Sequence, residues 1–178
     1  MMNKRRWVLS GTILVALVVV MALTAAAVMN WRTHLTGLNE VPVIMDSGGQ
    51  GQAIFQLRSD GQAIEFQLIV ANINNVWMSH IHMGAPGTNG PIVVWLYPRQ
   101  GPPPTTSLVG RTDGVLASGE ITADDLTGPL TGMSLQDLVD IIQSGNAYVN
   151  VHTRDFSGQL PPNSPGNYPA GEIRGNLP

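Results

Sequence analysis

Residues 52–70 read QAIFQLRSDGQAIEFQLIV, so apolar and polar side chains alternate on both sides of a Ser-Asp-Gly turn. Phe55 and Leu57 share one face of the first segment, and Phe66 and Leu68 share one face of the second. Successive side chains of a β-strand point to opposite faces, so this alternation is typical of half-buried strands. The stretch predicts a β-hairpin, and we expect these four side chains in the core.

Six further segments are short and apolar, and clusters of Gly, Pro, Asn and Asp separate them. These predicted strands are residues 32–38, 76–83, 91–97, 114–121, 147–153 and 172–177. Eight short strands at this spacing favour an antiparallel sandwich or barrel over alternating strands and helices. We therefore predict an all-β fold, an antiparallel Greek-key-like β-sandwich, with Val149 and Val151 also in its core.

Residues 134–145 are the one predicted helix. Ser134 is a suitable N-cap, Asp137 places an acid in the first turn, and Gly145 can end the helix. Its apolar positions form a stripe of helical spacing that consists of Leu135, Leu138, Val139 and Ile142. We expect one short crossover helix over one end of the sandwich.

Three segments are predicted loops. Residues 99–106 and 157–170 are rich in proline, which cannot donate the hydrogen bonds of a sheet. Residues 84–90 are rich in glycine and lie between two predicted strands, so we expect a tight turn there. Glu172 and Arg174 alternate on the last strand, where we expect an exposed ladder pair.

The N-terminus predicts a membrane anchor. Residues 1–6 carry three basic side chains, and residues 7–29 contain no charge, which is long enough for a transmembrane helix. Basic flanks stay in the cytoplasm, so residues 30–178 are expected on the periplasmic or extracellular side of the inner (cytoplasmic) membrane, with Trp31 and Arg32 as interfacial anchors. The alternative is a signal peptide cleaved after Ala27, where small residues satisfy the cleavage rule.

The composition of the rest of the chain excludes some functions. After Met29 there are six arginines, no lysine and twelve acidic residues, so the domain has no basic face for nucleic acid. There is no cysteine, so a hydrophobic core rather than disulfides must stabilise this exported domain.

The residues best suited to metal chemistry are histidines. His80 and His82 flank Ile81, so in a strand both imidazoles project from one face. His152 lies on the face opposite Val149 and Val151. If the three imidazoles converge, they suit copper or zinc. The alternative is structural, with half-exposed rings bonded to loop carbonyls, and His34 is expected to be structural.

Several blocks together resemble a known family. They are LTGLNEVP at 35–42, HIHMG at 80–84, GTNGPIVV at 87–94, GNAYVNVHT at 145–153 and GEIRGNL at 171–177. In this order they resemble the CHRD domain, named after chordin, across residues 33–178. The resemblance implies a secreted or membrane-anchored β-rich module, usually without an assigned activity.

A weaker likeness concerns the histidine segments, which resemble two copper-ligand segments of the copper,zinc superoxide dismutases. These enzymes are Greek-key β-sandwiches, and the likeness implies that His80, His82 and His152 match three copper ligands. The chain has no bridging histidine, no zinc loop and no cysteine pair. The likeness therefore implies a degenerate mononuclear site and no dismutase activity.

Three functions remain open. The first is a non-catalytic binding or bracing module, an accessory subunit of a larger complex of integral membrane proteins, respiratory or photosynthetic, without cofactor. Its support includes proline-rich loops and apolar residues expected at the surface, which are Trp77, Met78, Met83 and Trp95. The alternatives are an extracytoplasmic copper- or zinc-binding protein and an adhesion or matrix protein.

Overall fold

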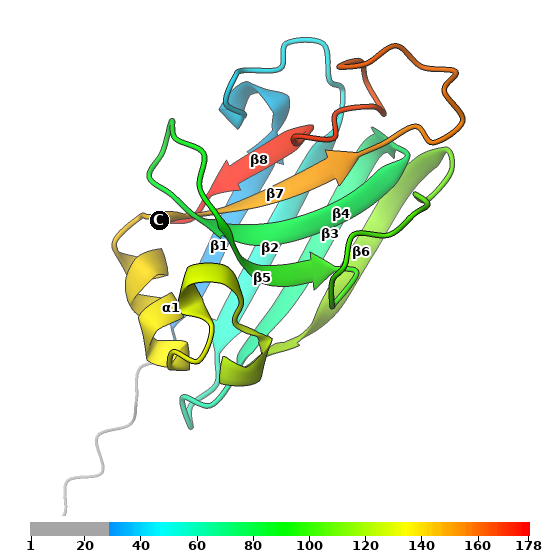
Figure 1. Ribbon diagram of the computed structural model, residues 1–178. Coiled ribbons are helices and arrows are strands. Elements are labelled where there is room, and N and C mark those ends of the chain that lie inside the picture. Colours follow the sequence, from blue (N-terminus) through cyan, green and yellow to red (C-terminus); the bar gives the residue numbers. More distant parts are fainter. Residues whose placement is uncertain (1–28) are drawn as a thin grey trace, which may run out of the picture.

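The computed structural model describes residues 29–178, in which eight strands form one antiparallel sheet (Figure 1). The strands are β1 (Asn30–Thr36), β2 (Gln50–Leu57), β3 (Ile64–Asn74), β4 (Val76–Met83), β5 (Ile92–Tyr97), β6 (Arg111–Ile121), β7 (Ala147–Thr153) and β8 (Ile173–Asn176). Their order is β5-β4-β7-β8-β1-β2-β3-β6. The sheet curls until the edge strands β5 and β6 lie close together, so it is nearly closed and barrel-like. The predicted all-β antiparallel fold is confirmed.

The one α-helix among the described residues, α1 (Leu135–Gln143), covers one end of the curled sheet (Figure 1). It begins with a capping box, in which the Ser134 and Asp137 side chains satisfy each other's backbone N–H groups. All four residues of the predicted stripe are buried and join the core. Three short 3-10 helices complete the described elements: η1 (Gly37–Asn39), η2 (Ala123–Asp125) and η3 (Gly128–Leu130).

The hydrophobic core fills the inside of the curled sheet. All six side chains predicted from the period-two pattern are buried: Phe55, Leu57, Phe66, Leu68, Val149 and Val151. Phe55 and Phe66 are direct partners in the β2–β3 ladder and stack with ring centroids 6.3 Å apart. The hairpin residues and the β7 valines therefore belong to one core cluster, as the alternation predicts.

The predicted membrane anchor and its interfacial residue Trp31 have different outcomes. The predicted anchor at residues 7–29 and the basic residues 1–6 lie, apart from Met29, outside the described residues. Among the residues that are described, no helix is long and apolar enough to cross a membrane. Trp31, expected as an interfacial anchor, is instead 7% exposed in β1 and packs into the core, because the strand alternation turns it inward while Arg32 faces solvent.

Four other residues expected at the surface are buried. Trp77 and Met78 are 8% and 7% exposed, and Glu172 and Arg174 are 1% and 0% exposed. The reason is that loops cover the outer face of β4, β7 and β8, which we define as the face turned away from the core. Arg174, for example, donates to the carbonyls of Thr88 and Ala85 in the glycine-rich loop. Sequence alternation identifies the face but does not show what covers it.

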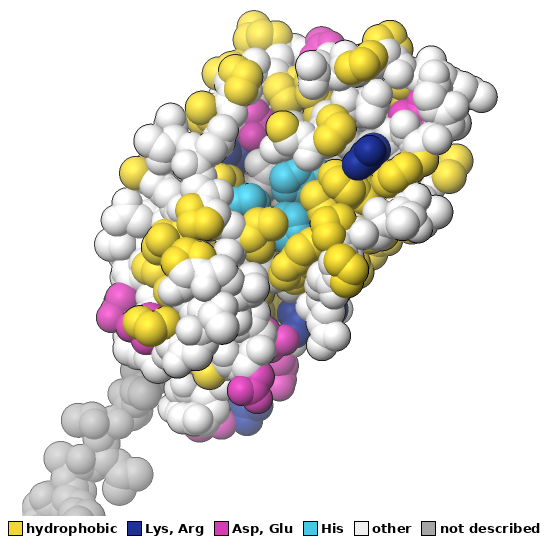
Figure 2. Space-filling model, viewed as in Figure 1, with side chains coloured by type: hydrophobic (Ala, Val, Ile, Leu, Met, Phe, Trp, Pro, Cys, Tyr) yellow, Lys and Arg dark blue, Asp and Glu magenta, His cyan; other side chains and the backbone are white. Residues whose placement is uncertain are grey.

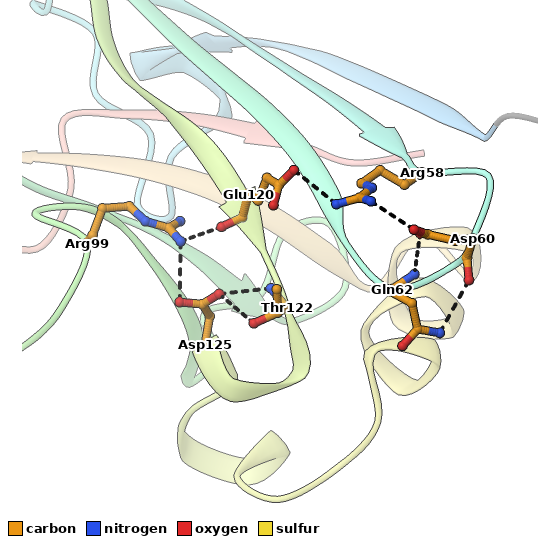
Figure 3. Close-up of polar contacts among 7 residues, drawn as sticks. All are labelled: Arg58, Asp60, Gln62, Arg99, Glu120, Thr122 and Asp125. Atoms are coloured by element: carbon orange, nitrogen blue, oxygen red, sulfur yellow. Dashed lines mark hydrogen bonds and ion pairs between the residues drawn. The ribbon is translucent and has the colours of Figure 1, made fainter.

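Most ion pairs of the described residues lie at the β2–β3 turn and the end of β6 (Figure 3). Arg58 bridges Asp60 at 2.8 Å and Glu120 at 3.2 Å, and both pairs are largely exposed. Arg99 bonds Asp125 and the Glu120 carbonyl. Exposed pairs of this kind contribute roughly 0–1 kcal/mol, so the buried apolar side chains dominate the stability.

Replacement of Phe66 by Ala should destabilise the domain strongly. Phe66 is 5% exposed and stacks on Phe55, so truncation leaves a cavity inside the sheet. We expect a loss of about 3–5 kcal/mol in the free energy of unfolding, measured by urea denaturation. Gln67→Ala on the exposed face of the same strand is the control and should cost less than about 1 kcal/mol. Equal losses in the two variants would contradict the register.

Candidate metal centre

The pairing of β4 with β7 brings the three predicted histidines together. In this ladder His82 lies opposite Tyr148, His80 opposite Asn150, and His152 opposite Met78. All six side chains therefore share the outer face. One ring nitrogen from each of His80, His82 and His152 lies within 4.8 Å of the other two. Figure 2 shows histidine side chains gathered near the middle of one face, beside hydrophobic side chains.

Loop carbonyls determine which nitrogen of two rings carries the proton. Nδ1 of His82 lies 2.9 Å from the Gly90 carbonyl oxygen, and Nδ1 of His152 lies 2.9 Å from the Pro169 carbonyl oxygen. A carbonyl oxygen only accepts, so each Nδ1 must donate. In the neutral ring the lone pair is then on Nε2. Metal-binding histidines are typically oriented by such bonds from the other ring nitrogen.

His80 completes the group. Its Nδ1 lies 3.2 Å from Nε2 of His152, and its ring packs edge-on against Trp95 with centroids 4.2 Å apart. Since His152 Nε2 carries a lone pair, His80 Nδ1 donates to it when no ion is present. The other tautomer of His80, protonated at Nε2, presents its Nδ1 lone pair beside that of His152. Among the described residues, Nε2 of His80 and Nε2 of His82 are buried without a hydrogen-bond partner.

Burial keeps all three imidazoles neutral. It lowers the pKa of His80 to about 2, with a further contribution from the neighbouring histidines. Burial likewise lowers the pKa of His152 to about 4, against the opposing effect of the Pro169 carbonyl. The pKa of His82 is also lowered, mainly by burial. Neutral imidazole is the form that binds metal ions, so the rings are ligand-competent at neutral pH.

A stack of side chains holds His82 in place. The Tyr148 ring lies parallel to the His82 ring, with centroids 4.8 Å apart and planes 9° apart. The Arg174 guanidinium lies 3.4 Å from the Tyr148 ring centroid on the β8 side. The Gly90 N–H donates to the Tyr148 hydroxyl at 3.1 Å. The predicted tight turn at 84–90 thus lies beside the histidines and helps to orient one of them.

Sequence reasoning missed Glu40, which is 4% exposed and contacts Asn150 on the outer face. The Asn150 amide donates to both of its carboxylate oxygens at 3.1 Å. Burial raises the pKa of Glu40 to about 7, although Arg174 and Asn150 lower it. Gly171 allows this approach, since a Cβ there would lie 2.8 Å from Glu40 Oε1. Only its place in the block at 35–42 could have singled Glu40 out.

The remaining predicted residue is separate from the group. His34 is exposed on β1, a strand two positions from β7 in the sheet order. Oδ1 of Asn150, the residue opposite His80, is also buried without a hydrogen-bond partner among the described residues. The three predicted ligands therefore come together, and the fourth histidine does not join them.

The comparisons with known proteins support one assignment. The model of the CHRD domain family matches residues 31–160, a range that includes His80, His82 and His152. No curated protein and no solved structure matches the chain.

The metal-free protein should lose stability as the pH falls from 6.5 to about 5. Histidines of the unfolded chain protonate near pH 6.5, whereas the buried imidazoles have lowered pKa values. The unfolded state therefore binds more protons, and stability falls. Glu40 opposes this, because its pKa is raised from 4.5 to about 7 and the folded state keeps its proton. The histidines outweigh the one carboxyl, and we expect a net loss of at least about 1 kcal/mol in the free energy of unfolding.

Urea denaturation of chelator-treated protein at pH steps across this window measures the effect. Glu40→Gln removes the opposing carboxyl and should make the loss steeper. Stability that stays level or rises between pH 6.5 and about 5 would show that the imidazoles are not buried in neutral form.

Proposed function

The chain belongs to the CHRD domain family, and from that premise we propose that it is an extracytoplasmic domain that binds one copper or zinc ion through His80, His82 and His152. The observation that carries this proposal is the convergence of three ring nitrogens within 4.8 Å. We assign the domain a binding role and no catalytic residue.

The spacing of the nitrogens supports a metal site. Zinc binds imidazole nitrogen at about 2.0–2.1 Å, so two ligands in a tetrahedral site are about 3.3 Å apart. His80 Nδ1 and His152 Nε2 are 3.2 Å apart. Three protein ligands leave one position of a tetrahedral ion for another group, as in open zinc sites.

The energetics favour the same proposal over a purely structural cluster. Leaving a buried polar atom without a partner costs about 1–3 kcal/mol, and two of the imidazoles have such a nitrogen. Apolar side chains would fill the same space without this cost. An ion bound to the converging lone pairs gives His82 Nε2 a partner.

We further propose that the curled sheet is a Greek-key sandwich of the kind that carries the copper ligands of copper,zinc superoxide dismutases. In its support, β6 pairs with β3 and β7 pairs with β4, so strands distant in sequence are neighbours. Within residues 29–178 the three histidines are the only cluster of potential ligands. We therefore propose a single mononuclear site and no dismutase reaction.

Removal of one ligand should abolish metal binding. Wild-type protein stripped with a chelator and dialysed against zinc or copper should retain one equivalent by metal analysis. A hundredfold excess over Kd should raise the free energy of unfolding by about 2.7 kcal/mol. We expect His82→Ala to lose both the metal and the stabilisation.

His34→Ala is the matched control, because it removes an exposed histidine of β1. It should bind and melt like the wild type. No stabilisation of wild-type protein at saturating zinc and copper would end the proposal, and so would equal losses in the two variants.

We also propose that residues 7–29 hold the domain at the outer surface of the cytoplasmic membrane, as an accessory to other integral membrane proteins. The uncharged run and its basic flank support the anchor. A surface for a partner protein is supported by a cleft of about 440 Å³ whose lining includes Val109 and Phe156. These side chains are 94% and 43% exposed, which leaves apolar area for contact with a partner.

Protease added to right-side-out spheroplasts, from which any outer membrane has been removed, should digest the domain but leave a tag fused before Met1 intact, because the basic N-terminus is expected in the cytoplasm. Immunoblots against the tag and against the domain separate the two ends. An intact domain under these conditions contradicts the orientation. A mature protein that begins near Val28 contradicts the anchor, since it shows cleavage of the segment.

A further inference from the structure

Met78 lies on the same strand and the same face as two of the histidines. Residues 78, 80 and 82 of β4 alternate with Ser79 and Ile81, so their side chains share the outer face. The direct partner of Met78 in the ladder is His152. Side chains in directly opposed positions have Cβ atoms about 4.5–5.5 Å apart. Met78 is therefore a neighbour of the histidine group by both strand and ladder.

The burial of Met78 has no explanation in the hydrophobic core. Its side chain is 7% exposed, yet it does not belong to the core cluster of the described residues. Met83, on the other face of the same strand, packs against that core. An unbranched side chain with three rotatable bonds can direct its sulfur toward a neighbouring site.

The chemistry around the histidines favours a soft ion of low charge. The cluster consists of three imidazoles without a carboxylate, and the Arg174 guanidinium lies only one aromatic ring away from His82. The cost of burying an ion rises steeply with its charge when no opposite charge pairs with it. Thioether and imidazole ligands together suit monovalent copper, whereas zinc is typically bound by nitrogen, thiolate and carboxylate oxygen.

We propose that the Met78 thioether sulfur is a fourth ligand of this site and that the ion is copper in its reduced, monovalent state. This inference rests on the three-histidine site of the proposed function and names the ion that the site selects. The Trp95 ring of β5 packs edge-on beside His80. An aromatic ring next to the site is compatible with a bound cation, because ring faces attract cations.

Metal affinity of Met78→Leu tests the proposal, because leucine keeps the size of methionine but removes the sulfur. Monovalent copper is titrated under anaerobic, reducing conditions against a chromophoric chelator, and zinc is titrated separately. We expect Met78→Leu to lower the affinity for monovalent copper by at least about tenfold and the affinity for zinc by less than about twofold. Met83→Leu is the matched control on the opposite face of the strand and should leave both affinities unchanged.

X-ray absorption at the copper edge provides a second readout, which reports the ligand atoms directly. Wild-type protein loaded with monovalent copper should show sulfur in the first coordination shell, and Met78→Leu should lack it. A shell of nitrogen alone in the wild type, or equal copper affinities in wild type and Met78→Leu, overturns the role of Met78. If the role of Met78 is overturned but wild-type protein still binds zinc through the histidines, the three-histidine site stands. If wild-type protein binds neither ion, the three-histidine site and the role of Met78 both fall.

Discussion

The antiparallel register between β4 and β7 is the constraint on which the site depends. It sets Ile81 opposite Val149 on the core side and His80 opposite Asn150 on the outer side. A shift of one residue would exchange the two faces of a strand. It would bury imidazoles among the core valines and expose Ile81, so the hydrophobic effect that stabilises the sheet also determines where the histidines meet.

The loops turn the outer face into a second buried layer. Carbonyls of Gly90 and Pro169 accept hydrogen bonds from two of the imidazoles, and Arg174 is enclosed by carbonyls of the same glycine-rich loop. Buried polar groups are costly unless they have partners. The layer therefore orients two of the imidazoles, and oriented ligands are what a selective metal site requires.

Period-two alternation predicted much of this structure from the amino-acid sequence. Short apolar segments between turn-forming residues predicted the other strands, and the alternation predicted the buried faces of β2, β3 and β7 and the shared face of His80 and His82. It failed where burial depends on loops from distant parts of the chain, as for Arg174 and Glu40, because alternation assigns a face and not its cover. The tautomers of His82 and His152 were also beyond prediction, since they depend on carbonyls 8 and 17 residues away in folded loops.

Long-range ¹H–¹⁵N NMR of the histidine rings can show whether three neutral imidazoles offer their lone pairs to one ion. In metal-free protein at neutral pH, Nε2 of His82 and of His152 should have the chemical shift of an unprotonated nitrogen. One equivalent of zinc should shift a nitrogen of each of the three buried rings together and leave His34 unchanged. Protonated Nε2 atoms in His82 and His152, or a response confined to one ring, would contradict a shared metal centre.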